Sequence, residues 1–247
     1  MYSPQEAVPY FKKLNQIATE FRIIKDKKMK KKIAFSIAFS ALLAFGTQAE
    51  ISGKDDKDTL VVIGTRFGEI TVVLFPETPV HRSNFLKLAS EQFFDSTTFH
   101  RIIKDFMIQG GDPNSKDDNP NNDGAGNTGY TLPAEFVPSL SHIQGALAAA
   151  RTENPEKRSS GCQFYLVENP GGTHFLDRNY SVFGQTIKGI DVIQNIAVQP
   201  KGAMDRPSNN IRMWMKLVPM KKEKITEMYG YDYSSHTVKP ELIKSKK

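Results

Sequence analysis

The side chains of this sequence that could do chemistry gather between residues 99 and 112. Within nine positions that stretch holds an arginine, an amide and two large apolar side chains, namely Arg101, Gln109, Phe106 and Met107. A guanidinium keeps its charge and presents a rigid fork of N–H donors, so Arg101 can donate hydrogen bonds to a reacting atom without giving up a proton. The alternative is a surface salt bridge from Arg101 to Asp105 or Asp112.

These four side chains can act together only if the backbone brings them to one groove. Residues 98–103 and 106–109 are short apolar runs that predict two strands. In a single regular strand the four side chains would not share one face, because successive side chains alternate. A bend around residues 104–105 would bring all four to the same groove.

Between residues 60 and 218 the chain alternates short apolar runs with turn-forming residues. The runs that predict further strands are residues 60–63, 69–75, 145–150, 162–167, 181–185 and 211–218. Amphipathic spacing predicts two helices, residues 79–92 after a Thr78 cap and residues 188–197. Gly, Asn, Asp and Pro make residues 111–129 a long surface loop. Many short strands with two helices predict a mainly β fold, a closed antiparallel barrel whose ends the helices cover.

The net charge of +6 does not predict a nucleic-acid partner, because of where the charges lie. Nine of the 33 basic residues and three of the 27 acidic residues precede residue 50, so the remaining 24 of each sign balance one another. A neutral body lacks the excess of Lys and Arg that drives binding to a phosphate backbone. We therefore expect no nucleic-acid partner.

The sequence up to residue 49 predicts export. Met29 is followed by three lysines, by the apolar run of residues 33–45 and by small residues that end at Ala49. This is the pattern of a signal peptide cleaved after Ala49, and it predicts a periplasmic or secreted protein. The apolar run covers thirteen residues, whereas a membrane span needs about 20, so we expect no permanent membrane anchor.

These features divide the chain into segments. Residues 1–28 are either a wrongly assigned extension or an unusually long start of the leader, and residues 29–49 are the signal peptide. Residues 50–58 are a linker, and residues 59–219 form the folded domain. Residues 220–247 are a polar, Lys-rich tail that either packs as an extension or stays mobile.

Covalent and metal chemistry find little support in the sequence. Cys162 is the single cysteine, so no intrachain disulfide and no zinc site built from several thiolates can form, and we predict no cofactor. Ser141 and His142 are adjacent but lack the strand-turn-helix context of a nucleophile, and the other histidines are scattered. A hydrolase is therefore not a convincing interpretation.

Residues 99–112 resemble the signature of cyclophilins, F-H-R-x-I-x-x-F-M-x-Q-G-G-D, at every fixed position. Similar blocks follow in the family's order at residues 78–85, 145–150, 161–165, 175–177 and 182–184. The resemblance runs from about residue 60 to residue 218. It implies an eight-stranded antiparallel barrel capped by two α-helices, and a peptidyl-prolyl cis/trans isomerase that acts on proline-containing polypeptides.

The resemblance also implies a site. Arg101 would donate to the prolyl nitrogen, which regains a lone pair when amide resonance is lost, and Gln109 would bind a substrate carbonyl or steady Arg101. The substrate-binding residues that it implies are Phe106, Met107, Ala150, Arg151, Gln163, Phe164, Phe175, Leu176 and Tyr180. Because the reaction transfers no proton, His100 is interpreted as structural.

This sequence departs from the family's pattern at several places, among them Cys162, which replaces a small Ser and is interpreted as packed. Arg151 stands where Asn is common, and we expect it to be tolerated because that position holds substrate mainly through its backbone. Tyr180 replaces a common His. Phe175 replaces the Trp of cyclosporin-sensitive members and lacks an indole N–H, so we expect weak or no cyclosporin binding. Residues 153–160 lengthen a loop, which could alter contacts beyond the proline.

Two other functions compete with isomerisation. A non-catalytic proline-binding module or holdase chaperone would keep the groove and act through the long loops or the tail. A cyclophilin of the cell interior that associates with nucleic acid is the other, and both the leader and the neutral body count against it.

Overall fold

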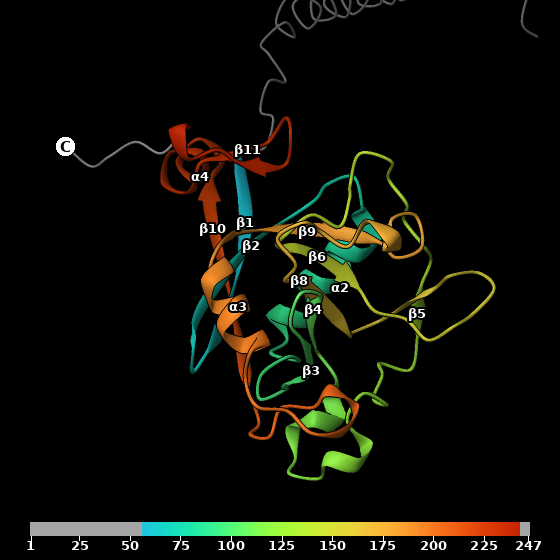
Figure 1. Ribbon diagram of the computed structural model, residues 1–247. Coiled ribbons are helices and arrows are strands. Elements are labelled where there is room, and N and C mark those ends of the chain that lie inside the picture. Colours follow the sequence, from blue (N-terminus) through green and yellow to red (C-terminus); the bar gives the residue numbers. More distant parts are fainter. Residues whose placement is uncertain (1–55, 243–247) are drawn as a thin grey trace, which may run out of the picture. The chain divides into compact units, whose positions relative to one another are not determined.

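The computed structural model describes residues 56–242. The predicted signal peptide, most of the predicted linker and residues 243–247 lie outside the described residues. Eight antiparallel strands form one sheet, which curls around an apolar interior (Figure 1). Across the sheet the strands are β10 (Met213–Lys221), β1 (Lys57–Thr65), β2 (Gly68–Leu74), β9 (Val182–Lys188), β6 (Ala146–Ala149), β8 (Phe164–Val167), β4 (Met107–Gly110) and β3 (Phe99–Ile103).

All eight predicted strands are present, although their ends move by a few residues. The largest change is in β1, which begins at Lys57 because it pairs with β10 along its whole length, from Lys57 opposite Lys221 to Thr65 opposite Met213. Sequence alternation alone did not reveal this extension, because its partner lies more than 150 residues away.

The two edges of the sheet, β3 and β10, approach each other without forming a continuous ladder. Thr98 and Arg212 make a single isolated bridge. Beside it the Phe99 amide donates to the Ile211 carbonyl at 2.9 Å, and the Met213 amide donates to the Thr97 carbonyl at 2.8 Å. The antiparallel eight-stranded sheet is therefore confirmed, but the fully closed barrel is not.

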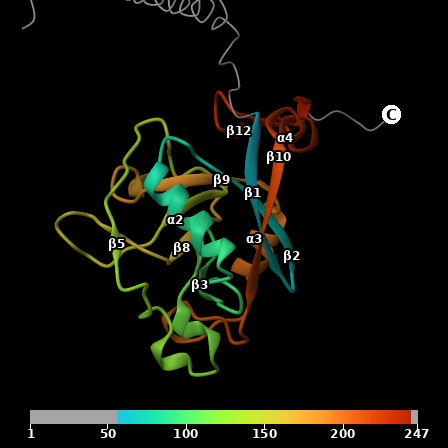
Figure 2. The same ribbon diagram turned by 180° about the vertical axis from the view of Figure 1, so that it is seen from behind.

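Both predicted helices are present, and they pack against opposite ends of the sheet's interior. Helix α2 (Pro79–Ser90) lies nearest the viewer in Figure 2, and α3 (Ile190–Ala197) lies nearest the viewer in Figure 1. The buried faces of α2 and α3 join one core with the inward side chains of the strands. Apolar burial of this interior, at about 25 cal/mol per Å², is what holds the curled sheet together.

The start of α2 is capped from a distance. Thr78 occupies the cap position, but its hydroxyl donates to the Phe75 carbonyl at 3.3 Å and caps no helical amide. The carboxylate of Glu135 accepts from the amides of Val80 at 3.1 Å and His81 at 2.9 Å instead. The predicted Thr78 side-chain cap was wrong, because a stronger anionic acceptor from another loop satisfies these donors.

A second apolar cluster lies on the outer face of the sheet. Strand β8 shows why two clusters exist: Phe164 and Leu166 point into the interior core, whereas Tyr165 and Val167 point into the outer cluster. This is the period-two alternation of a strand that is buried on both faces. The outer cluster forms the floor beneath the groove described below.

A third α-helix, which the two-helix prediction missed, follows β10. Helix α4 (Lys222–Tyr229) leads into a small hairpin of β11 (Tyr231–Asp232) and β12 (Thr237–Val238) at one end of β1 and β10 (Figures 1 and 2). Ile225 and Tyr231 are fully buried in the outer cluster. Tyr229 and Tyr233 pack against the same cluster, and the Tyr233 hydroxyl donates to Asp58 Oδ2 at 3.3 Å, so apolar packing and hydrogen bonds together dock this segment.

The remaining elements are short. Strands β5 (Thr131–Leu132) and β7 (Ser159–Ser160) pair with each other outside the main sheet. Five single-turn 3₁₀ helices complete the described residues: η1 (Pro113–Lys116), η2 (Pro120–Asn122), η3 (His174–Leu176), η4 (Ala203–Asp205) and η5 (Pro240–Leu242).

Candidate functional site

A pocket of about 130 Å³ opens on the outer face of the sheet. It collects eight of the predicted site residues together with one that was not predicted. They are Arg101, Phe106, Met107, Gln109, Ala150, Arg151, Leu176 and Tyr180, with Tyr165 as the addition.

The hairpin between β3 and β4 explains how residues 101–109 reach one pocket. Arg101 lies directly opposite Gln109 in the ladder, and Ile103 lies opposite Met107, so these side chains share the outer face. Asp105 adopts a left-handed conformation with φ of 60°, and Phe106 leaves the turn beside Met107. The predicted bend around residues 104–105 is the turn of this hairpin.

The turn is tied to the loop that follows β8. The Asp105 amide donates to Glu168 Oε2 at 2.6 Å, and Asn169 Nδ2 donates to the Asp105 carbonyl at 2.9 Å. These bonds oppose the strain of a left-handed non-glycine residue. They fix the direction in which Phe106 enters the pocket.

Arg101 stands at the rim of the pocket, with 40% of its side chain exposed. Its Nε lies 3.8 Å from Asp205 Oδ2, which is a loose ion pair between two half-exposed groups. Asp105 and Asp112, the partners considered from the sequence, form no ion pair with it among residues 56–242. The fork is thus steadied on its Nε side, and its terminal N–H groups remain for a ligand.

Gln109 is oriented by Gln163. The Gln109 Nε2 donates to Gln163 Oε1 at 3.0 Å, while Gln163 Nε2 donates to the carbonyls of Gly124 and Gly126, both at 2.9 Å. Gln163 lies outside the lining of the 130 Å³ pocket and lines the neighbouring depression. Its contacts fix the amide of Gln109 with the carbonyl oxygen free to accept.

Phe164 does not line the pocket as expected, and the unpredicted Tyr165 takes its place. Phe164 was implied as a pocket wall, but it is 1% exposed and packs edge-to-face with Phe85, Phe94 and Phe99 in the interior core. Tyr165, one position along β8, faces the pocket. The signal that could have found Tyr165 is strand alternation, because Met107 and Ala148 face outward on the neighbouring strands.

Tyr165 is held in place by a buried histidine. Its ring stacks on His142 at 5.9 Å, and its hydroxyl donates to His142 Nε2 at 2.9 Å. The other ring nitrogen, Nδ1, donates to Asp177 Oδ1 at 2.7 Å. Burial lowers the pKa of His142, so the ring is neutral and these two bonds select its tautomer.

The far side of the pocket comes from the end of η3 and the segment that follows it. Leu176 and Tyr180 form this wall, and the Arg151 guanidinium lies 4.6 Å above the Tyr180 ring. Phe175 is 72% exposed and stacks on Phe106, with 5.7 Å between ring centroids. Phe175 therefore belongs to the outer rim and lies outside the lining of the pocket itself.

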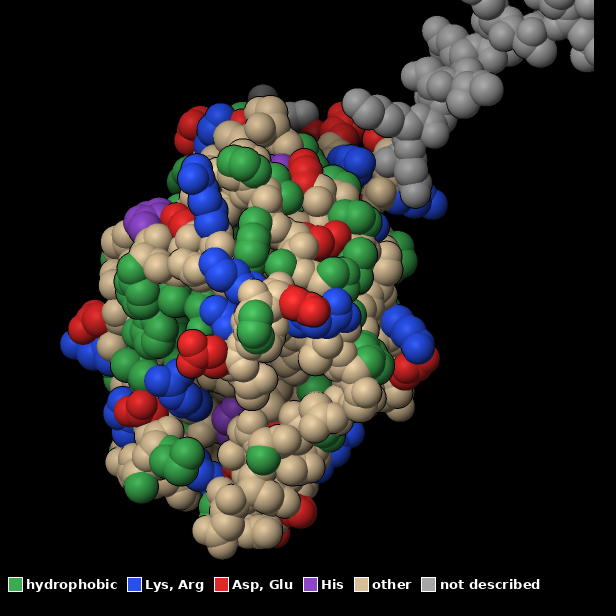
Figure 3. Space-filling model, turned by 90° about the vertical axis from the view of Figure 1, so that its right-hand side faces the viewer, with side chains coloured by type: hydrophobic (Ala, Val, Ile, Leu, Met, Phe, Trp, Pro, Cys, Tyr) green, Lys and Arg blue, Asp and Glu red, His purple; other side chains and the backbone are tan. Residues whose placement is uncertain are grey.

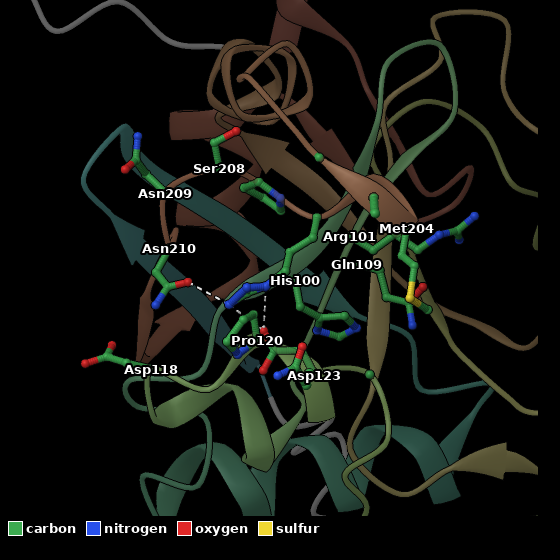
Figure 4. Close-up of a pocket in the computed structure, with 16 residues that line it drawn as sticks. His100, Arg101, Gln109, Asp118, Pro120, Asp123, Met204, Ser208, Asn209 and Asn210 are labelled. Carbon is green, nitrogen blue, oxygen red and sulfur yellow. Dashed lines mark hydrogen bonds and ion pairs between the residues drawn. The ribbon is translucent and has the colours of Figure 1, made fainter.

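A larger hollow of about 880 Å³ meets the pocket at Arg101 and Gln109. In Figure 4 the side chains of Asn209 and Asn210 stand on one side of it, Gln109 and Met204 on the other, and His100 between them. Its other cation, Arg206, is already paired with Asp123 at 2.7 Å and donates to Asn210 Oδ1 at 2.9 Å. Within residues 56–242 no group of three or more His, Cys, Asp or Glu side chains could hold a metal ion.

The geometry defines a class of site. A small pocket with Phe106, Met107 and Leu176 among its walls and an arginine fork at its rim, on the outside of a curled antiparallel sheet, suits a peptide that inserts one compact side chain and offers carbonyls to donors. No group in the pocket is placed to attack or to transfer a proton. The site is therefore one for binding and conformational change of a peptide.

Comparisons with known proteins agree with this class. Residues 60–216 match the family model "Cyclophilin type peptidyl-prolyl cis-trans isomerase/CLD". A "Peptidyl-prolyl cis-trans isomerase-like 1" of Neurospora crassa is 34% identical, over 63% of this chain and 91% of that protein. A "Putative bifunctional phosphatase/peptidyl-prolyl cis-trans isomerase" of Streptococcus pyogenes is 35% identical over 61% of this chain, which spans only 37% of that longer protein.

A solved structure is also similar. The cyclophilin type peptidyl-prolyl cis-trans isomerase of Cryptosporidium parvum was crystallised in the presence of the dipeptide Ala-Pro. It superposes with a TM-score of 0.56 at 27% sequence identity, and the alignment covers 64% of this chain and 97% of the Cryptosporidium chain. This chain belongs to the cyclophilin-type peptidyl-prolyl cis-trans isomerase family, and its enzyme class is that of an isomerase.

Proposed function

We propose that this chain accelerates rotation about X–Pro bonds in folding proteins of the cell envelope, with Arg101 as hydrogen-bond donor to the prolyl nitrogen. The barrier to this rotation is about 18–20 kcal/mol because amide resonance is lost at mid-rotation. The nitrogen then regains a lone pair that a donor can bind. Such a donor lowers the barrier because it binds the twisted state better than the planar ones.

The observation that carries the proposal is the position of Arg101 at the rim of a small pocket walled in part by apolar side chains, with terminal N–H groups that no described residue occupies. Phe106, Met107 and Leu176 would hold the pyrrolidine ring, and Gln109 would accept or donate at a neighbouring peptide group. Rotation needs no bond cleavage, which fits a pocket without a nucleophile.

The proposed location rests on the leader. Residues 29–49 have the pattern of a cleaved signal peptide, and they lie outside the described residues. Among residues 56–242 no helix is both long enough and apolar enough to cross a membrane. N-terminal sequencing of the exported protein tests this point, and a mature chain that begins at residue 50 is the expected result.

We also propose that this protein binds no nucleic acid and binds cyclosporin weakly. On the face shown in Figure 3, basic and acidic side chains are interspersed, which supports the absence of a nucleic-acid partner. We expect weak cyclosporin binding, because Phe175 at the rim has no N–H to donate. Phe175→Trp should strengthen that binding, and a sub-micromolar dissociation constant for the parent would contradict the expectation.

The test is cis/trans exchange of an Ala-Pro peptide measured by NMR with the full chain. The parent should accelerate exchange, and Arg101→Ala should lose on the order of 10²–10³ in kcat/KM, the size of effect that follows the loss of a preorganised donor. Arg101→Lys keeps the charge but not the fork, and should recover only part of the rate. Arg66→Ala is the matched control, because Arg66 lies in the turn between β1 and β2 and lines neither the pocket nor the adjoining hollow.

The alternative function makes a different prediction. A proline-binding module or holdase would bind the peptide, seen as shifts of pocket resonances, without accelerating exchange. A folded parent that binds and does not catalyse would therefore replace the isomerase proposal.

A further inference from the structure

A depression of about 520 Å³ adjoins the 130 Å³ pocket, which is the proposed proline pocket, and it also borders the 880 Å³ hollow at Gln109 and Gly124. It shares Gln109, Ala150 and Arg151 with the proline pocket, so a peptide held in one continues into the other. Its far wall comes from Arg158 and Ser160, at the end of the lengthened loop that the family resemblance did not explain. This loop therefore contributes directly to the groove beside the proline.

The charges that line this depression are all positive. Arg151 and Arg158 are its two ionised side chains, and no Asp or Glu is part of its lining. The 880 Å³ hollow is different, because there Arg206 is neutralised by Asp123 at 2.7 Å. Two cations without lining anions raise the local potential and favour an anionic group.

Both guanidinium groups are held in place by neutral acceptors. Arg158 donates to Thr131 Oγ1 at 2.7 Å and to the Thr131 carbonyl at 2.9 Å, and Arg151 donates to the Asn179 carbonyl at 3.2 Å. These acceptors fix the direction of each fork and leave its charge uncancelled. Such fixed forks lose less side-chain entropy when they bind an anion than freely rotating lysines would.

The nearest carboxylate competes poorly. Glu156 Oε2 is 3.9 Å from Arg158 Nη1, at the limit of an ion pair, and its side chain is 75% exposed. The Arg158 side chain is 39% exposed, so a ligand can reach it. An exposed, distant carboxylate neutralises little of a charge that faces a groove.

We propose that this depression selects substrates that carry an anionic side chain, a carboxylate or a phosphate, close to the proline. The anion binds between Arg151 and Arg158 while the proline occupies the neighbouring pocket. The inference rests on the proposed isomerase function, and it names the substrate class of that same groove.

The experiment measures KM and kcat of the full chain on matched peptides by NMR exchange. The peptides have the form Xaa-Ala-Pro-Ala and Ala-Ala-Pro-Xaa, with Xaa being Glu, Gln or Lys. In one of the two positions, Glu should give a KM about tenfold below Gln, with Lys the highest and kcat similar in all three. The ratio should shrink towards one at 0.5 M salt, because the charges are half exposed.

Three variants locate the effect. Arg158→Gln should reduce the ratio of Gln to Glu KM values to about twofold, and Arg158→Lys should restore part of it. Asn127→Asp adds a charge to the lining while its side-chain oxygen still accepts from the Gly129 amide, so it should abolish the preference without unfolding the loop. Arg66→Gln is the matched control, and it should leave the ratio unchanged.

The outcomes separate this inference from the proposed function. Active parent enzyme with equal KM values for Glu and Gln in both positions overturns the anionic subsite. Parent enzyme that accelerates no peptide overturns the proposed function, and the subsite is then judged from the dissociation constants of the Glu and Gln peptides. A phosphoserine peptide of the same form identifies the preferred anion. A KM well below that of the Glu peptide shows that the subsite prefers a phosphate, and an equal KM shows that it prefers a carboxylate.

Discussion

A shift of one position along β8 separates a core residue from a pocket residue. Phe164 and Tyr165 are adjacent aromatic residues in a motif, and both types suit a proline pocket. The strand places Phe164 among the rings of the interior and Tyr165 against His142 on the outer face. The assignment of a motif residue to a site therefore needs the direction of its side chain as well as its identity.

Substitution of the two residues should therefore affect different properties, substrate binding for Tyr165 and stability for Phe164. Tyr165→Ala should raise KM for an Ala-Pro peptide by about tenfold, because the pocket loses a wall. Phe164→Ala should lower the free energy of unfolding by about 3–5 kcal/mol, because it leaves a cavity in the core. Urea denaturation and NMR exchange on both variants measure these effects. The reverse pattern would return Phe164 to the site.

At the scale of elements, the segment after β10 is part of the fold. Tyr231 is fully buried against the outer cluster, and its hydroxyl hydrogen-bonds His236 Nδ1 at 2.7 Å. None of the residues after Tyr180 lines the 130 Å³ pocket. The extension therefore contributes to stability through packing and leaves the chemistry to the sheet.

Removing this anchor should uncouple stability from catalysis. Tyr231→Ala should lower the free energy of unfolding by about 3–5 kcal/mol while kcat/KM of the remaining folded enzyme changes little. Met228→Ala, in the same helix at 44% exposure, should change stability by less than about 0.5 kcal/mol. Urea denaturation of both variants provides the comparison. Equal effects in the two would contradict the anchor role of Tyr231.

At the scale of the whole molecule, three buried histidines make stability depend on pH. Burial lowers the pKa of His81 and His142, and it lowers the pKa of His100 to about 4. Between pH 6.5 and about 4 the unfolded chain binds a proton at His100 and the folded chain does not, and the lowered pKa values of His81 and His142 act in the same direction below pH 6.5. Stability is therefore full above pH 6.5 and falls as the pH drops, by up to about 1.4 kcal/mol per pH unit for each histidine.

The measurement is the free energy of unfolding in urea at pH 7 and pH 5. The parent should be less stable at pH 5, and His100→Phe should flatten this dependence. The matched control is His174→Phe, because the His174 side chain is 55% exposed. A parent whose stability is the same at both pH values would show that folding does not lower the pKa of these rings.

The family and most of the pocket could be predicted from the sequence, because they depend on residue types in a fixed local order. Residues 99–110 form one hairpin, so Arg101, Phe106, Met107 and Gln109 are brought together by the pairing of two neighbouring strands. Alternation and apolar spacing likewise placed all eight strands and helices α2 and α3, since each reflects burial of one face or both.

Only the tertiary structure decided which distant groups complete the site. Asp205 approaches Arg101 across 104 positions, Glu135 caps α2 from another loop, and Arg158 joins Arg151 beside the proline pocket. No local pattern encodes such pairs, because they form only when packing brings separate segments together. The sequence by itself determined which reactive and binding side chains this protein has. The tertiary structure decided which of them lie together in one site, because packing brings distant segments into contact.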